Sequence, residues 1–264
     1  MITPILMLGA GRMGGAILEG WRRAGAFASS DLMICDPQPS PAALALALDG
    51  AQLNPPNAEL ARARTVVLAV KPQVWADTAA QYVPWLSAEA VIISIAAGVR
   101  AAALGKEFGG RCVARVMPTT AAAINQGTAS LYAEDPAALA RAHALFEPLG
   151  AVVDLADEEL MHAATAVSGS GPAYLYAFVE ALEGAAMAAG LPNKEASRLA
   201  RSTITGAAAR LAQSASEPVE LRRQVTSPGG TTEAALNVLL SNTGLPPLLR
   251  EAVTAALRRS KQLG

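Results

Sequence analysis

The sequence is poor in aromatic residues, histidine and cysteine and has almost no net charge, and each scarcity excludes a class of protein. Only 4% of its 264 residues are aromatic, and the formal net charge is −1, so no charge excess favours nucleic acid or an anionic membrane as partner. The two histidines have no metal-ligand spacing around them, and we expect no metal site. Cys35 and Cys112 lie in apolar, strand-like runs, which predicts two core thiols in a reducing compartment rather than a disulfide.

Targeting and membrane segments are not expected either. The apolar N-terminus lacks the basic residues that open a secretory signal peptide. The run Ala173–Gly190 is long and apolar, but Glu180 and Glu183 would each cost about 2–3 kcal/mol near the centre of a bilayer, and basic flanks are missing. We interpret this run as a buried helix in a soluble, cytoplasmic homo-oligomer.

A glycine pattern near the N-terminus is the most informative feature that is present. Ile5–Leu8 has the composition of a buried strand, Gly9, Gly11 and Gly14 follow with the spacing G-x-G-x-x-G, and an amphipathic helix comes next. Such glycines permit a tight turn, close approach to a pyrophosphate and close helix–strand packing. Glycine turns also join strands to helices without a ligand, but Asp36 at the end of the next apolar run favours a dinucleotide site.

Strand and helix patterns alternate up to about residue 153, and only helical patterns follow. The expected strands are Ile5–Leu8, Leu32–Cys35, Thr65–Val70, Val91–Ile95 and Cys112–Met117, with Thr128–Tyr132 and Val152–Leu155 as edge strands. The expected helices after the boundary are Pro172–Ala189, Lys194–Ser214, Pro218–Val225, Thr232–Ser241 and Pro246–Gln262. The pattern predicts an α/β protein: an N-terminal Rossmann-type doubly wound parallel sheet (1–153), which binds the dinucleotide, followed by an all-helical dimerisation and substrate domain (154–264).

The cofactor site is expected where strands end. Ligands of open α/β sheets lie beyond the carboxyl ends of the strands. The predicted cofactor-binding residues are therefore Gly9, Gly11, Arg12, Met13, Gly14, Asp36, Val70, Lys71, Pro72, Ala96, Ala97, Gly98, Met117, Pro118 and Thr119. Lys71 could also be an ordinary solvated lysine, but its position at a strand end beside a proline turn favours a functional role.

Two segments of the helical half carry hydroxyls and glycines. The first is the segment 165–172. An alternative interpretation of it is that Ser170 or Gly171 simply caps a helix that begins at Pro172. In the second, 227–233, two glycines and two threonines precede a helix, which predicts a nest of N–H groups for a carboxylate. A capping box does not fit there, because Glu233 follows Thr232 directly.

Taken together, the motifs of this chain resemble those of the pyrroline-5-carboxylate reductases over essentially its whole length. The motifs are G-A-G-R-M-G (9–14), A-V-K-P-Q (69–73), S-I-A-A-G (94–98), R-V-M-P (115–118), T-A-V-S-G-S-G-P-A-Y (165–174) and V-T-S-P-G-G-T-T (225–232), of which the last two are the most specific. The resemblance implies hydride transfer from NADPH or NADH to the C=N carbon of L-1-pyrroline-5-carboxylate, giving L-proline. It also implies an intertwined dimer that often assembles into larger rings.

The resemblance further implies roles for individual residues. The substrate carboxylate would be held by Ser227, Gly230, Thr231 and Thr232. Thr165 would hydrogen-bond the ring nitrogen, and Lys71 would line the site. Two segments depart from the family pattern. The family shows M-P-N-T-P where this chain has Met117-Pro118-Thr119-Thr120-Ala121, and many members carry a basic residue where it has Asp36-Pro37-Gln38.

These departures leave alternatives open for the function and for the cofactor. The chain could be another imine or hydroxyacid reductase on the same fold, or a nucleotide-binding regulator without turnover. The resemblance favours NADPH. Asp36, twenty-two residues beyond Gly14, is placed to accept hydrogen bonds from the ribose of NADH and to repel a 2′-phosphate, unless it only caps the turn at Pro37. We expect NADH to be usable and NADPH to be disfavoured.

Overall fold

The computed structural model describes residues 2–263, which form two compact units. The first unit runs to Gly169 and includes the C-terminal residues from Ala256 onward; the second is Ser170–Ala255. β8, the last strand, ends at Asp154, and the first unit continues beyond it through one short helix and one turn to Gly169.

A single sheet organises the first unit. Its strands, within residues 2–263, follow the order β3-β2-β1-β4-β5-β6-β7-β8. They are β1 (Ile5–Leu8), β2 (Leu32–Cys35), β3 (Gln52–Leu53), β4 (Thr65–Leu68), β5 (Val91–Ser94), β6 (Val113–Pro118), β7 (Gly127–Ala133) and β8 (Gly150–Asp154). Neighbours are parallel except β6 and β7. The order changes direction between β1 and β4, as in doubly wound dinucleotide folds, and the predicted fold class is confirmed.

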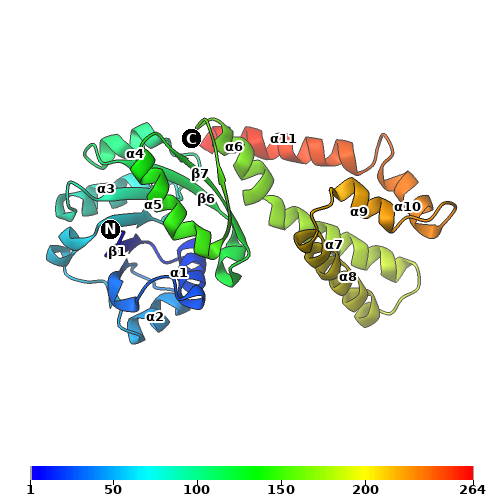
Figure 1. Cartoon of the computed structure of the whole chain (residues 1–264), viewed down its shortest axis with the longest axis horizontal. Helices are drawn as coiled ribbons and strands as arrows, with labels where there is room; N and C mark the ends of the chain where they lie inside the picture. The colour runs from blue at the N-terminus through cyan, green and yellow to red at the C-terminus, as the bar shows by residue number, and fades with distance from the viewer. Residues whose placement is uncertain (1, 264) are drawn as a thin grey trace. The chain divides into compact units, whose positions relative to one another are not determined.

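Helices cover both faces of this sheet (Figure 1). Alternate residues of β1 point to opposite faces, because side chains alternate along a strand. Ile5 and Met7 enter one apolar cluster, and Leu6 and Leu8 enter the other. The first cluster is covered by α1 (Arg12–Ala24), α2 (Pro41–Leu48) and α5 (Pro136–Phe146), and the second by α3 (Trp75–Tyr82) and α4 (Ala101–Glu107). A sheet buried on both faces explains why its strands are continuous apolar runs.

Helices make up the second unit, as predicted. Strands are absent from the described chain after Asp154. The helices are α7 (Gly171–Ala188), α8 (Asn193–Gln213), α9 (Pro218–Gln224), α10 (Thr231–Leu239) and α11 (Leu245–Leu263), whose last turns belong to the first unit. Large apolar side chains of this unit remain exposed in one copy of the chain; Tyr176 is 67% exposed and Val238 71%. Between residues 2 and 263 we find no helix with the length and apolarity needed to cross a bilayer.

Three expectations about local structure are wrong. Cys112 is not a core thiol, because β6 begins only at Val113 and the cysteine side chain is exposed. β7 is not an edge strand, since it lies between β6 and β8. It also runs antiparallel to β6, against the expected parallel sheet. The capping alternative for Ser170 is confirmed in part: Ser170 is the N-cap residue of α7, but it has helical φ and ψ and makes no side-chain capping bond.

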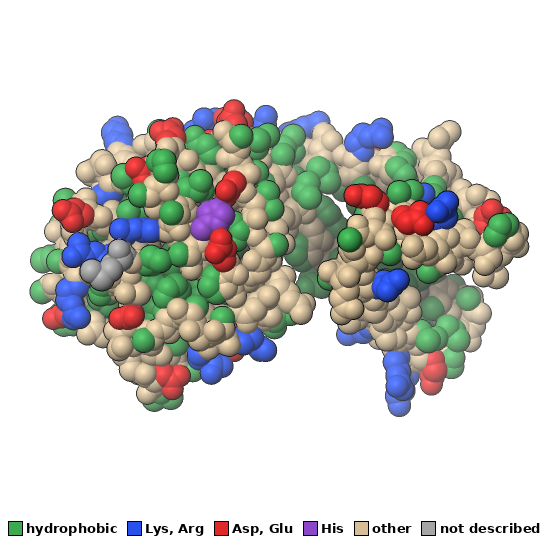
Figure 2. All heavy atoms as spheres, viewed as in Figure 1, with side chains coloured by type: hydrophobic (Ala, Val, Ile, Leu, Met, Phe, Trp, Pro, Cys, Tyr) green, Lys and Arg blue, Asp and Glu red, His purple; other side chains and the backbone are tan. Residues whose placement is uncertain are grey.

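The structure also contains short elements that the sequence patterns did not indicate. They include β3, α4, α6 (Leu160–Ala164) and the π-helical turn η6 (Thr165–Gly169). Figure 2 shows acidic and basic side chains interspersed over the visible face of the first unit, without a large patch of one sign.

Candidate functional site

The glycine loop between β1 and α1 has the geometry that its spacing predicts. Gly9 has φ +94°, and a Cβ there would lie 2.7 Å from the carbonyl oxygen of Ala69. A Cβ on Gly14 would overlap the Gly9 carbonyl oxygen. Gly11 faces open space, since a Cβ on it would meet no heavy atom within 4 Å. The loop therefore presses α1 against the sheet and leaves its outer face accessible.

The start of α1 offers backbone donors to an anion. The first hydrogen bond of this helix runs from the N–H of Gly15 to the carbonyl of Gly11 at 2.7 Å. The N–H groups of Arg12, Met13 and Gly14 precede it and have no acceptor within the helix. A shallow groove of about 430 Å³ lies beside them, lined partly by Gly11, Arg12 and Ser40. These donors, the helix dipole and the open backbone at Gly11 fit a dinucleotide pyrophosphate.

Gly15 also lines this groove, which the G-x-G-x-x-G spacing did not indicate. A Cβ there would lie 2.8 Å from the Ser40 hydroxyl oxygen, so the glycine permits close approach of α1 to the N-terminus of α2. The doubled glycine at 14–15 was the available signal.

Asp36 holds the glycine loop to the turn after β2. Its Oδ2 accepts the N–H of Ala10, and its Oδ1 accepts the N–H of Gln38 at 2.7 Å. The bond from Gln38 shows that Asp36 does cap the turn at Pro37, which was the alternative to a ribose contact. Each carboxylate oxygen can accept a second hydrogen bond, so a ribose hydroxyl remains compatible with this arrangement.

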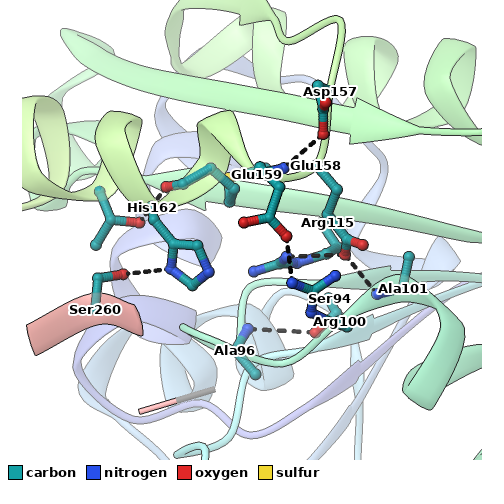
Figure 3. Close-up of polar contacts among 12 residues, drawn as sticks. Ser94, Ala96, Arg100, Ala101, Arg115, Asp157, Glu158, Glu159, His162 and Ser260 are labelled. Atoms are coloured by element: carbon teal, nitrogen blue, oxygen red, sulfur yellow. Dashed lines mark hydrogen bonds and ion pairs between the residues drawn. The ribbon is translucent and has the colours of Figure 1, made fainter. Parts of the chain in front are cut away.

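Two further strand ends contribute the loops 70–72 and 96–98. Val70 and Pro72 are half-buried and Lys71 is exposed. The second loop begins with a hydrogen bond from the N–H of Ala96 to the Ser94 hydroxyl oxygen at 3.3 Å (Figure 3). It ends at Gly98, whose φ of +80° favours glycine. Both loops follow neighbouring parallel strands, so they lie at the same edge of the sheet as the glycine loop.

The end of β6 lies beside the π-helical turn. A Cβ on Gly169 would lie 3.6 Å from the Met117 sulfur, which places Met117 against η6. Thr165, the first residue of that turn, donates its hydroxyl proton to the Met161 carbonyl at 2.7 Å. Its oxygen lone pairs are then left as acceptors. Thr119 is buried, and its hydroxyl accepts the N–H of Thr128 at 3.0 Å, so this departure from the family pattern joins β6 to β7.

In the second unit, the 227–232 loop begins α10 with Gly230 as its N-cap residue. Gly229 has φ +68°, and its N–H donates to Glu233 Oε2 at 2.7 Å. The N–H of Gly230 donates to the Ser227 carbonyl at 3.0 Å. The sequence spacing that excludes a capping box between Thr232 and Glu233 does not reveal this contact of Glu233 with Gly229. This contact satisfies the Gly229 N–H within the protein.

The histidines lie outside the predicted site residues. Burial and then the charge of Arg115 lower the pKa of His162, whose Nδ1 lies 3.0 Å from the Ser260 hydroxyl (Figure 3). A hydrogen bond with Glu147 raises the pKa of His143, as does its contact with Asp154. No three His, Cys, Asp or Glu side chains among residues 2–263 are grouped to hold a metal ion.

Comparisons with known proteins cover the whole chain. Residues 158–263 match the family model described as pyrroline-5-carboxylate reductase dimerisation, and residues 4–98 match that of NADP oxidoreductase, coenzyme F420-dependent. The chain is 40% identical to pyrroline-5-carboxylate reductase of Pseudomonas aeruginosa, covering 100% of this chain and 98% of that protein. A pyrroline-5-carboxylate reductase structure from Coxiella burnetii matches with TM-score 0.91 at 31% identity over 100% and 99% of the chains. The NADP-bound Plasmodium falciparum structure matches with TM-score 0.84 at 26% identity over 99% and 98%.

Proposed function

The chain belongs to the pyrroline-5-carboxylate reductase family, and from this membership we propose how its residues divide the work of the reaction. It is an NAD(P)H-dependent reductase that transfers a hydride to the C=N bond of L-1-pyrroline-5-carboxylate and so forms L-proline. The full-length match to reductases of this name carries the assignment. It does not favour a different imine or hydroxyacid reductase, or a regulator without turnover.

The dinucleotide is proposed to bind along the carboxyl edge of the sheet. Its pyrophosphate would take the N–H groups of Arg12, Met13 and Gly14, which precede the first hydrogen bond of α1. Its nicotinamide end would lie near the loops 70–72 and 96–98 and the segment Met117–Thr119. When bound, the nicotinamide supplies the hydride.

The substrate carboxylate is proposed to bind the 227–232 loop. Glu233 and the Ser227 carbonyl already accept the N–H groups of Gly229 and Gly230, so the support comes from the donors that follow them. The N–H groups of Thr231 and Thr232 precede the first hydrogen bond of α10, from Ala234 to Gly230, and add donors at the positive end of the helix dipole. The hydroxyls of Ser227, Thr231 and Thr232 complete the set.

Thr165 is proposed to accept a hydrogen bond from the protonated ring nitrogen. Its own proton is already donated to the Met161 carbonyl, so the hydroxyl faces a substrate N–H as an acceptor. Such a bond favours the charged iminium, which is the electrophilic form of the substrate. Lys71 is proposed to line the same site. The protein then has mainly to align two reactants and exclude water.

Self-association follows from the dimerisation match over residues 158–263 and from the exposed apolar side chains of the second unit. We propose that the dimers assemble further into a ring and that the protein is cytoplasmic. The two free thiols, Cys35 and Cys112, support a reducing compartment.

Replacement of Thr232 by valine tests the substrate loop. The KM for pyrroline-5-carboxylate should rise about 10- to 100-fold, because one hydrogen bond to a charged group contributes roughly 1.5–3 kcal/mol. The KM for the cofactor should stay within twofold. Thr254→Val is a matched control, since that exposed hydroxyl bonds only to its own helix at the Arg250 carbonyl. Unchanged substrate KM in folded Thr232→Val would refute the placement of the carboxylate.

A further inference from the structure

A buried ion pair joins three segments of the first unit (Figure 3). Arg115 lies in the middle of β6, and its side chain is 3% exposed. Its Nη1 lies 2.9 Å from Oε1 of Glu158, whose side chain is 15% exposed. The same oxygen accepts the N–H of Ala101, the first residue of α4, at 2.6 Å. One carboxylate thus holds together β6, the start of α4 and the segment that precedes α6.

Each of these three segments continues into a part of the proposed site. β6 ends at Pro118 and leads into the segment Met117–Thr119, which begins two residues beyond Arg115. α4 begins at Ala101, three residues after the end of the 96–98 loop. The segment with Glu158 leads through α6 to Thr165 at the start of η6. The contacts of this carboxylate therefore fix the positions of the three segments relative to one another.

The neighbouring ion pair shows which features of Glu158 matter. Arg100 and Glu159 also pair, and they connect the same loop and the same segment. Their side chains are 57% and 50% exposed, however, so solvent weakens that pair. Arg115 is buried, so loss of its counter-charge would destabilise the fold much more than loss of an exposed partner would.

We propose that Glu158, held by Arg115, is a positioning residue for hydride transfer. This inference rests on the proposed function. Glu158 is assigned no contact with cofactor or substrate. Its charge keeps the end of β6, the 96–98 loop and the Thr165 turn in register, so that the hydride donor and the C=N carbon meet at reacting distance. Displacement of reacting groups by about 1 Å can cost roughly 100-fold in rate.

Glu158→Gln tests the proposal, because glutamine can still accept the N–H of Ala101 but leaves Arg115 without a counter-charge. We expect kcat to fall roughly 10- to 100-fold. The KM for NADH and NADPH should stay within twofold, since the pyrophosphate binds the distant glycine loop. The deuterium isotope effect on kcat, measured with NADH deuterated at the transferred position, should rise as hydride transfer becomes rate-limiting. Glu159→Gln is the matched control and should match wild type.

A purely structural role would give a different pattern. It would lower the melting temperature of Glu158→Gln and the fraction of active enzyme, without a change in the isotope effect, and that result would overturn the proposal. The double variant Arg115→Met with Glu158→Gln removes both charges and should regain thermal stability. Its kcat should stay low, and recovery of kcat together with stability would also overturn the proposal.

The double variant serves for the same measurements where Glu158→Gln yields no folded protein. A wild-type protein without turnover of pyrroline-5-carboxylate would refute the proposed function and this inference with it. An active wild type with an unaffected kcat and isotope effect in Glu158→Gln would refute the inference alone.

Discussion

Replacing Asp36 should move the cofactor preference toward NADPH. The carboxylate follows β2 and contacts the glycine loop through the N–H of Ala10, so it lies at the expected ribose end of the dinucleotide. A 2′-phosphate there would bring a second negative charge close to the first. No lysine or arginine follows Asp36 before Arg62 to offset it.

The magnitude follows from Coulomb's law and the contacts of Asp36. At 4 Å, two unit charges repel by about 1 kcal/mol in bulk water and about 4 kcal/mol at an effective dielectric constant of 20. Removal of the carboxylate should therefore raise the ratio of kcat/KM for NADPH to that for NADH by at least about fivefold. The side chain also accepts two backbone N–H bonds, from Ala10 and Gln38, whose loss would weaken the turn itself.

Two variants separate the charge from these contacts. Asp36→Asn keeps an oxygen acceptor of the same shape and removes only the charge, whereas Asp36→Ser removes the reach to Ala10 as well. Steady-state kinetics with both cofactors should show the shift in both variants, with better thermal stability in Asp36→Asn. The wild-type ratio in both folded variants would refute the view that Asp36 reads the ribose.

Three further predictions concern packing, thiol reactivity and pH. Gly20→Ala should destabilise the protein by roughly 1–3 kcal/mol, because the new methyl group would overlap backbone of the neighbouring 3₁₀ helix, whereas Gly105→Ala, which has room, should not lower the melting temperature. Native protein should react with Ellman's reagent at Cys112 only, since burial raises the pKa of Cys35 to about 11; two rapidly reacting thiols would contradict this. The raised pKa of His143 stabilises the fold fully below the ordinary histidine pKa of 6.5, and this contribution is lost as the pH rises through the higher folded-state pKa. The stability difference between wild type and His143→Gln should shrink over that rise, as measured by urea unfolding.

The sheet and the glycine loop could be predicted because their physics is local. Buried parallel strands are short apolar runs, and the spacing of Gly9, Gly11 and Gly14 reflects backbone geometry within six residues. The N-cap of α2 is equally local, since Ser40 accepts the N–H of Ala43 three residues later. Such features need no knowledge of distant contacts.

Other features depend on groups far away in the sequence. α4 has no side-chain cap of its own, and the carboxylate that binds its first N–H comes from Glu158, 57 residues later. The antiparallel direction of β7 follows from its hairpin with β6, which alternation of strands and helices does not reveal. Cys112 shares an apolar run with β6 but precedes its first paired residue, so composition alone misplaced it.

Transfer of a labelled hydride tests the central claim most directly. Wild-type protein is incubated with L-1-pyrroline-5-carboxylate and NADH or NADPH deuterated at the transferred position of C4, and the product is analysed by mass spectrometry and NMR. The account predicts L-proline with one deuterium on the ring carbon that was double-bonded to nitrogen, at a rate equal to cofactor oxidation. Cofactor oxidation without labelled proline, or no turnover with either cofactor, would contradict it.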